Sequence, residues 1–137
     1  MSEASPDKSS RPICEGLVGE DAEGPFLLGG RCKACGFVTL GVRDTCPECW
    51  ARGSMTSLPI GRRGSVYTST VVHQVPQGYD APFAVGYVDI EDGVRVFAHV
   101  ERVQAALKPG TKVRLTVAPM RRDKDGASLV GPLYVTE

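Results

Sequence analysis

The chain has 137 residues, which is enough for one domain of ordinary size or for two small ones that share a surface. Its sixteen basic and sixteen acidic residues cancel, which disfavours a dedicated nucleic-acid binder because such proteins usually carry a strong basic excess. No apolar run approaches the roughly 20 residues that span a bilayer, so we expect no membrane segment. Cysteines spaced for metal binding and no export signal together predict a cytoplasmic protein.

The first segment in chain order, residues 1–11, is rich in Ser, Pro, Asp and Lys without an apolar pattern, which predicts a disordered leader. Residues 12–19 are predicted to form a short N-terminal helix with its apolar side chains on one face, and Cys14 to be a plain small hydrophobe within it. Residues 20–25 are acidic and rich in helix breakers, which indicates a loop.

Two Cys-x-x-Cys motifs with ten residues between them dominate the next segment; their cysteines are Cys32, Cys35, Cys46 and Cys49. Each motif directs two thiolates at one point, and two facing motifs supply the four soft ligands of a tetrahedral zinc ion. Gly36 follows the first pair and permits the positive φ that such a turn commonly needs. Since the protein fills all four positions, the zinc is expected to be structural rather than catalytic.

Three other uses of these cysteines can be compared with zinc. Two disulfides would suit a secreted domain, but no signal peptide is recognisable. A thioredoxin-like redox pair would leave the second motif unexplained. Iron in a rubredoxin-like site remains chemically open, because four thiolates bind either metal.

Short apolar runs flank the first motif, and residues 26–28 are predicted to pair with residues 37–40 as two strands of a zinc ribbon. Trp50 follows the last cysteine, and its indole is expected to pack over the metal site or against the next domain. Residues 51–64 contain Gly, Ser, Pro and Arg and are predicted to be a connector.

From residue 65 onward the sequence is typical of strands, with β-branched residues and alternating apolar positions. One helical segment is predicted at 101–107, and a turn at 123–126. Five strands with a helix between the third and fourth match the plan of an OB-fold barrel. Gly86 is expected to allow a sharp bend in the second strand. The five predicted strands are residues 65–75, 83–90, 94–100, 112–118 and 129–136.

The predicted fold class is therefore mainly β: a rubredoxin-like zinc ribbon followed by a five-stranded OB-fold barrel, with a short N-terminal helix. We divide the chain into a leader at 1–11, a helical segment with zinc ribbon at 12–60, and a barrel at 61–137.

No convincing catalytic set is recognisable, because both histidines, His73 and His99, lie in predicted strands without an obvious nucleophile or carboxylate partner. Two basic clusters in loops beside barrel strands could instead bind phosphate, since guanidinium groups hold phosphate oxygens in pairs. They consist of Arg62 with Arg63, and of Arg121, Arg122 and Lys124.

The sequence resembles a known family in both halves. The ribbon pattern Leu28-x-x-Arg31-Cys32-x-x-Cys35-Gly36 with Arg43-x-x-Cys46-Pro47-x-Cys49, the first-strand run at 66–73 and Gly131-Pro132-Leu133-Tyr134 are similar to the acyl-CoA-associated zinc-ribbon and OB-fold family, catalogued as domain of unknown function thirty-five. The resemblance covers roughly residues 13 to 137.

This resemblance implies an accessory subunit that is not catalytic alone. Members of the family pair with thiolase-fold proteins, or occasionally with hydratase-like ones, in archaeal acetoacetyl-CoA thiolase assemblies, steroid side-chain aldolases and benzoylsuccinyl-CoA thiolase. The partner, in a hetero-oligomer expected to be α2β2, would supply the catalytic cysteine and histidines, while this subunit would help to bind CoA or acyl-CoA. We therefore expect the two basic clusters to contact CoA, and Arg43, Trp50 and Phe83 to contact the partner.

Two alternatives belong to other classes. OB barrels and zinc ribbons also bind single-stranded nucleic acid, and Phe83, Tyr87 and Phe97 could stack on bases, but the balanced charge disfavours this. A self-sufficient hydrolase or transferase would have to use His73 or His99.

Overall fold

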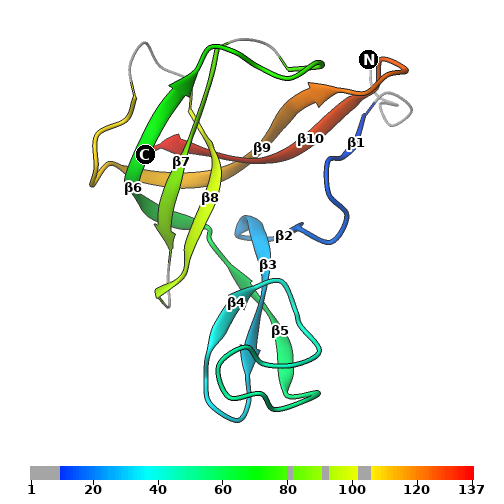
Figure 1. Ribbon diagram of the computed structural model, residues 1–137, viewed down its shortest axis with the longest axis vertical. Coiled ribbons are helices and arrows are strands. Elements are labelled where there is room, and N and C mark those ends of the chain that lie inside the picture. The colour runs from blue at the N-terminus through cyan, green and yellow to red at the C-terminus, as the bar shows by residue number, and fades with distance from the viewer. Residues whose placement is uncertain (1–9, 80–81, 91–92, 102–105) are drawn as a thin grey trace.

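A computed structural model describes residues 10–79, 82–90, 93–101 and 106–137. The described residues contain ten strands and no α-helix, and Figure 1 shows a small ribbon sheet joined to a larger barrel. The strands are β1 (Ser10–Pro12), β2 (Val18–Asp21), β3 (Gly24–Cys32), β4 (Val38–Leu40), β5 (Met55–Ile60), β6 (Arg63–Val72), β7 (Phe83–Ile90), β8 (Arg95–Val100), β9 (Lys112–Arg122) and β10 (Ser128–Thr136).

The barrel follows the OB-fold plan. Its strands pair in the order β6-β7-β8-β10-β9, and β9 also pairs with β6, which closes the sheet on itself. The β8–β10 pairing is parallel and the other pairings of the barrel are antiparallel. All five predicted barrel strands are confirmed. They form because β-branched residues at alternate positions point into the closed interior.

Gly86 is required in β7, although for close approach rather than for a bend alone. A Cβ at this position would lie 2.4 Å from the carbonyl oxygen of Thr68 and 2.8 Å from the Cβ of Ser69. The register between β6 and β7 shifts between Val66 and Thr68, so the bulge in β6 brings its backbone close to Gly86.

The ribbon is a four-stranded sheet centred on β3. Strand β5 covers one edge of β3, while β2 and β4 cover the other edge in succession. The predicted hairpin forms, but Val38–Leu40 pair with Gly29–Arg31 rather than with residues 26–28. The prediction of a connector at 51–64 is wrong, because Met55–Ile60 form β5; Pro59 is tolerated there because its strand lies at the edge of the sheet.

The predicted short N-terminal helix is also wrong. Pro12 ends β1, Gly16 has a φ of 77°, and β2 begins at Val18, so a bend joins two strands where the helix was expected. Strand β1 pairs in parallel with β10, and it includes Ser10 and Arg11 from the predicted leader. Residues 1–9 and most of the helical segment predicted at 101–107 lie outside the described residues. No described helix is long and apolar enough to cross a membrane.

Ribbon and barrel share one hydrophobic core. Leu27 and Ile60 from the ribbon lie in the same buried cluster as Val66 and Val88 from the barrel. Fully buried Tyr134 of β10 crosses the junction, where its hydroxyl donates a hydrogen bond of 2.7 Å to the carbonyl oxygen of Gly61. The two sheets are therefore held together by packing as well as by the chain that links them.

Candidate metal centre and ligand surfaces

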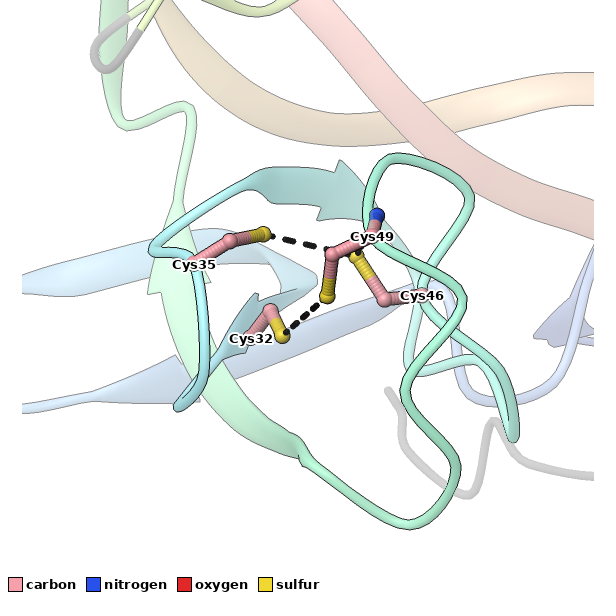
Figure 2. Close-up of side chains that lie close together, drawn as sticks. All are labelled: Cys32, Cys35, Cys46 and Cys49. Carbon is pink, nitrogen blue, oxygen red and sulfur yellow. Dashed lines mark hydrogen bonds between the residues drawn. The ribbon is translucent and has the colours of Figure 1, made fainter.

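The four cysteines of the two motifs meet at one point. Their four Sγ atoms all lie within 4.8 Å of one another, and Figure 2 shows them turned towards a common centre. The Cys32–Cys49 and Cys35–Cys46 sulfur pairs are each 3.7 Å apart. Zinc–sulfur bonds of about 2.3 Å in a tetrahedron place neighbouring sulfurs about 3.8 Å apart, so the thiol set fits a tetrahedral zinc ion.

The two Cys-x-x-Cys turns have the same backbone geometry. Gly36 N–H donates to the Cys32 carbonyl at 2.8 Å, and Trp50 N–H donates to the Cys46 carbonyl at 3.0 Å. Gly36 has a φ of 83° and Trp50 a φ of 69°, which makes Trp50 the one non-glycine among the described residues with positive φ. Its side chain is 77% exposed, so the prediction that the indole packs over the metal site or the barrel is wrong.

Hydrogen bonds prepare two of the thiols to be thiolates. Ser54 contacts the Cys32 sulfur at 3.1 Å and, together with the N–H of Cys35, lowers the pKa of Cys32 to about 6. The N–H groups of Cys49 and Glu48, at 3.5 and 3.4 Å from the Cys46 sulfur, lower the pKa of Cys46.

The other two thiols resist ionisation when no cation is present. The Phe37 N–H lowers the pKa of Cys35, but burial and the neighbouring cysteine sulfurs outweigh it and raise that pKa to about 12. The pKa of Cys49 is also raised, because burial and its contacts with Cys32 and Cys46 outweigh the Ala51 N–H. Four clustered sulfurs of this kind are stable as thiolates only around a cation, which a bound zinc ion would provide.

The two arginines of the first basic cluster face different surroundings, because Arg62 lies in the bend before β6 and Arg63 begins the strand. The Arg62 guanidinium donates to both carboxylate oxygens of Asp21, at 2.9 and 2.6 Å, and to the carbonyl oxygen of Gly24 at 2.9 Å. It also lies over the Phe26 ring at 5.0 Å from the centroid, so it stabilises the β2–β3 turn. Arg63 points outward, 78% exposed, with its Nε 3.5 Å from a Glu137 carboxylate oxygen.

The second basic cluster lines a pocket at the other end of the barrel. Arg121, Arg122 and Lys124 surround a space of about 660 Å³ together with Gln77, Gly78 and Asp123, and the Asp123 carboxylate is paired with Arg11. Arg63 pairs with Arg114, seven residues before Arg121 on β9, which is about 23 Å at roughly 3.3 Å per residue. The structure therefore does not bring the two clusters together.

The residues expected to contact a partner are also dispersed. Arg43 and Trp50 belong to the ribbon, where Arg43 lines a groove of about 1030 Å³ between ribbon and barrel. Phe83 begins β7 at its far end and contacts the rings of Tyr79 and His99, at centroid distances of 5.1 and 5.0 Å.

Neither histidine is placed in a catalytic set by the described residues. No hydrogen bond joins His73 or His99 to a serine or a carboxylate in the part of the chain that the structure describes. His99 is half-buried beside Tyr79 and Phe83, and burial lowers its pKa.

An exposed aromatic surface on the outer face of β6, β7 and β8 was only partly anticipated from the sequence. Tyr87 and Phe97 are in contact at 5.2 Å between ring centroids, and Tyr67 lies under the Arg95 guanidinium at 3.5 Å. The signal was the alternation of β8, which directs Val96 inward and therefore Arg95 and Phe97 outward. Tyr67 had no such signal, because it lies at the bulge in β6.

Comparison with known proteins identifies both parts of the chain. A family model described as ChsH2, rubredoxin-like zinc ribbon domain matches residues 27–55, and one described as ChsH2, C-terminal OB-fold domain matches residues 58–118. Benzoylsuccinyl-CoA thiolase subunit BbsA of Thauera aromatica is 32% identical over 110 residues, which cover 80% of this chain and 76% of that protein. This chain belongs to the ChsH2 zinc-ribbon and OB-fold family.

Other members and a solved structure agree with this assignment. BbsA of Geobacter metallireducens is 32% identical to the ChsH2-family chain, with 82% of this chain and 76% of BbsA covered. A DUF35 domain-containing scaffold protein of Methanocaldococcus jannaschii is 33% identical over 76 residues, which cover 54% of each chain. The Ltp2-ChsH2(DUF35) aldolase structure superposes with a TM-score of 0.63 at 22% identity. The match covers 81% of this chain and 84% of the aldolase chain, which supports the fold.

Family membership also settles the use of the four cysteines. Cys32, Cys35, Cys46 and Cys49 of the ChsH2-family chain form its zinc-ribbon site, because all four lie within the matched ribbon and their sulfurs cluster as a zinc ion requires.

Proposed function

We propose that this chain is a non-catalytic accessory subunit of a thiolase-type acyltransferase complex and helps to bind acyl-CoA. The observation that carries the proposal is its similarity, over 80% of its length, to a protein named as a benzoylsuccinyl-CoA thiolase subunit. A thiolase-fold partner would perform the CoA-dependent chemistry in a hetero-oligomer of α2β2 composition.

The geometry of the zinc-ribbon site supports a structural rather than a chemical role. All four ligands come from protein, which leaves no open coordination position for a substrate. Bound zinc would supply folding energy and would fix the two Cys-x-x-Cys turns relative to each other. Ser54 and the N–H groups around Cys46 would hold the thiolate ligands in place.

For CoA, the pocket lined by Arg121, Arg122 and Lys124 is the stronger of the two candidate sites. The phosphates of CoA are all on or next to one ribose, so a single compact basic cluster suffices to bind them. Arg62 already bonds Asp21 and Gly24, which leaves Arg63 as the outward-facing member of the other cluster.

For the partner, Trp50 is the residue with the clearest sign of function. A non-glycine residue in the left-handed region costs about 1–2 kcal/mol, and such strain is usually retained where a side chain has a role. An exposed indole is also the side chain most enriched at the centres of protein interfaces. Arg43 and Phe83 are proposed to contribute beside it.

The test begins with co-purification of the full-length chain and its catalytic partner from the native cells. We expect a stable hetero-oligomer in which thiolysis of β-ketoacyl-CoA substrates, benzoylsuccinyl-CoA among them, requires both chains. A partner that turns over at the full rate alone would contradict the accessory role. Measuring the affinity of the complex for CoA distinguishes the two basic clusters. The double variant Arg121→Ala with Arg122→Ala should weaken CoA binding about tenfold or more, and Arg63→Ala serves as the comparison.

A further inference from the structure

The groove between ribbon and barrel is bordered by two strand edges. The groove has a volume of about 1030 Å³. Residues 36–40 line it on the ribbon side and residues 93–97 on the barrel side, so β4 and β8 form its walls. Figure 1 shows the lower part of β8 beside β4, below the point where β8 meets β10.

The edge of β8 that faces away from β7 carries backbone N–H and C=O groups that form no hydrogen bond with a described strand. Ile90 N–H donates to the Val94 carbonyl at 2.9 Å, so alternate residues from Val94 onward bond to β7. Arg95 and Phe97 therefore point their N–H and C=O groups away from β7. Strand β10 pairs only with His99 and Val100, which leaves Arg95–Ala98 without a strand on this side among the described residues.

Strand β4 has the same property on the opposite wall. Cys32 N–H donates to the Phe37 carbonyl at 2.9 Å and Gly41 N–H to the Leu28 carbonyl at 2.8 Å, so the odd-numbered residues bond to β3. Val38 and Leu40 direct their backbone groups away from β3. Within the described part of the chain, no strand pairs with them there.

We propose that this groove receives an extended segment of the catalytic partner, which adds as a strand to the free edge of β8. The proposal rests on the proposed function for the existence of that partner. A row of unused N–H and C=O groups recognises an extended peptide backbone, because only that ligand matches its alternating spacing.

The side chains beside the groove specify the character of the segment. Phe97 is 63% exposed and Phe37 40% exposed, and both line the groove. Arg95 is neutralised by Asp89, to which its Nε donates at 2.5 Å, and the other two charged residues that line the groove, Arg43 and Glu48, have opposite signs. The segment should therefore place apolar side chains against the two phenylalanines and carry no excess charge there. Tyr87, in contact with Phe97, extends this apolar surface over the outer face of β7.

Substitution at Phe97 separates strand addition from ordinary side-chain docking. Phe97→Pro removes the outward N–H without a bond to β7 being lost, whereas Phe97→Ala removes only the ring. We expect Phe97→Pro to weaken the complex with the co-purified catalytic chain about tenfold more than Phe97→Ala does. Ser57→Pro is the matched control, because Ser57 lies on the exposed edge of β5, two residues from Pro59, and should change affinity less than twofold.

Amide hydrogen exchange, measured by NMR on the unsubstituted full-length chain, gives a test that does not depend on variants folding. Amides of Arg95 and Phe97 should exchange rapidly in the free chain, while those of Val96 and Ala98 are protected by β7. Binding of the catalytic chain should protect Arg95 and Phe97 by tenfold or more.

The results that would contradict strand addition can be distinguished from those that would contradict the proposed function. A complex that forms without protecting these amides, or that is weakened equally by Phe97→Pro and Phe97→Ala, overturns strand addition and leaves the proposed function standing. Protection already present in the free chain assigns the groove to another part of this chain, and protection that grows with its concentration assigns it to a second copy; either overturns the inference. Failure of any thiolase-type chain to bind overturns both proposals.

Discussion

Truncation of Ile60 tests whether ribbon and barrel unfold as one unit. Ile60 ends β5, is fully buried and belongs to the core cluster that both sheets share. A Cβ on Gly29 would lie 2.5 Å from its Cδ1, so the side chain packs directly on the β3 backbone and the site has little freedom to collapse. Ile60→Ala should therefore cost about 2–5 kcal/mol, and Ile60→Val about 0.5–1.5 kcal/mol.

The assay follows two signals during one thermal melt. Near-ultraviolet circular dichroism reports the barrel tyrosines, and a chromophoric chelator reports zinc release from the ribbon. At a few degrees per kcal/mol for a chain of this size, Ile60→Ala should lower both midpoints by roughly 6–20 °C, and Ile60→Val by about a quarter of that. A zinc-release midpoint that stays fixed while the barrel signal falls would refute the shared core as the coupling between the two parts.

Three further predictions follow from single contacts. Cys32→Ser should reduce zinc from one ion per chain to substoichiometric levels by elemental analysis, whereas Cys14→Ser, at an exposed cysteine outside the cluster, should retain it. Gly86→Ala should lower the free energy of unfolding, measured by urea denaturation, by about 1–3 kcal/mol because its Cβ meets the Thr68 carbonyl; an unchanged free energy would contradict the close approach. Trp50→Gly should keep zinc and stability, since it relieves a positive φ, yet weaken partner binding; a destabilised ribbon would instead indicate a structural role for the indole.

The metal site and the barrel could be predicted from sequence because both depend on short-range patterns. Two Cys-x-x-Cys turns bring their thiols together through local geometry, and the period of two in the barrel strands marks their buried faces. The closure of β6 onto β9 was reached only through the OB-fold plan, since no local signal specifies a pairing between residues so far apart.

The errors arose where tertiary pairing overrides a local signal. Ile13 and Leu17 have helical spacing, but β1 beside them pairs with β10 and β2 pairs with β3, so the segment between bends instead. Pro59 indicated a connector, yet an edge strand accepts a residue without an N–H. Arg62 and Arg63 are adjacent in sequence, but Arg62 lies in the bend before β6 and bonds Asp21, whereas Arg63 begins β6 and faces solvent.

The shared core gives the structural zinc a consequence for binding. One wall of the groove is β4, which directly follows the first Cys-x-x-Cys turn, and the other wall is β8 of the barrel. The position of β4 depends on the metal through that turn, and the position of the ribbon relative to β8 depends on Ile60 and Tyr134 at the junction. Loss of zinc should therefore widen or disorder the proposed strand-binding groove before it affects the closed barrel. Bound zinc would then contribute to recognition of the proposed partner without touching either the partner or the substrate, because it would fix the distance between two strand edges.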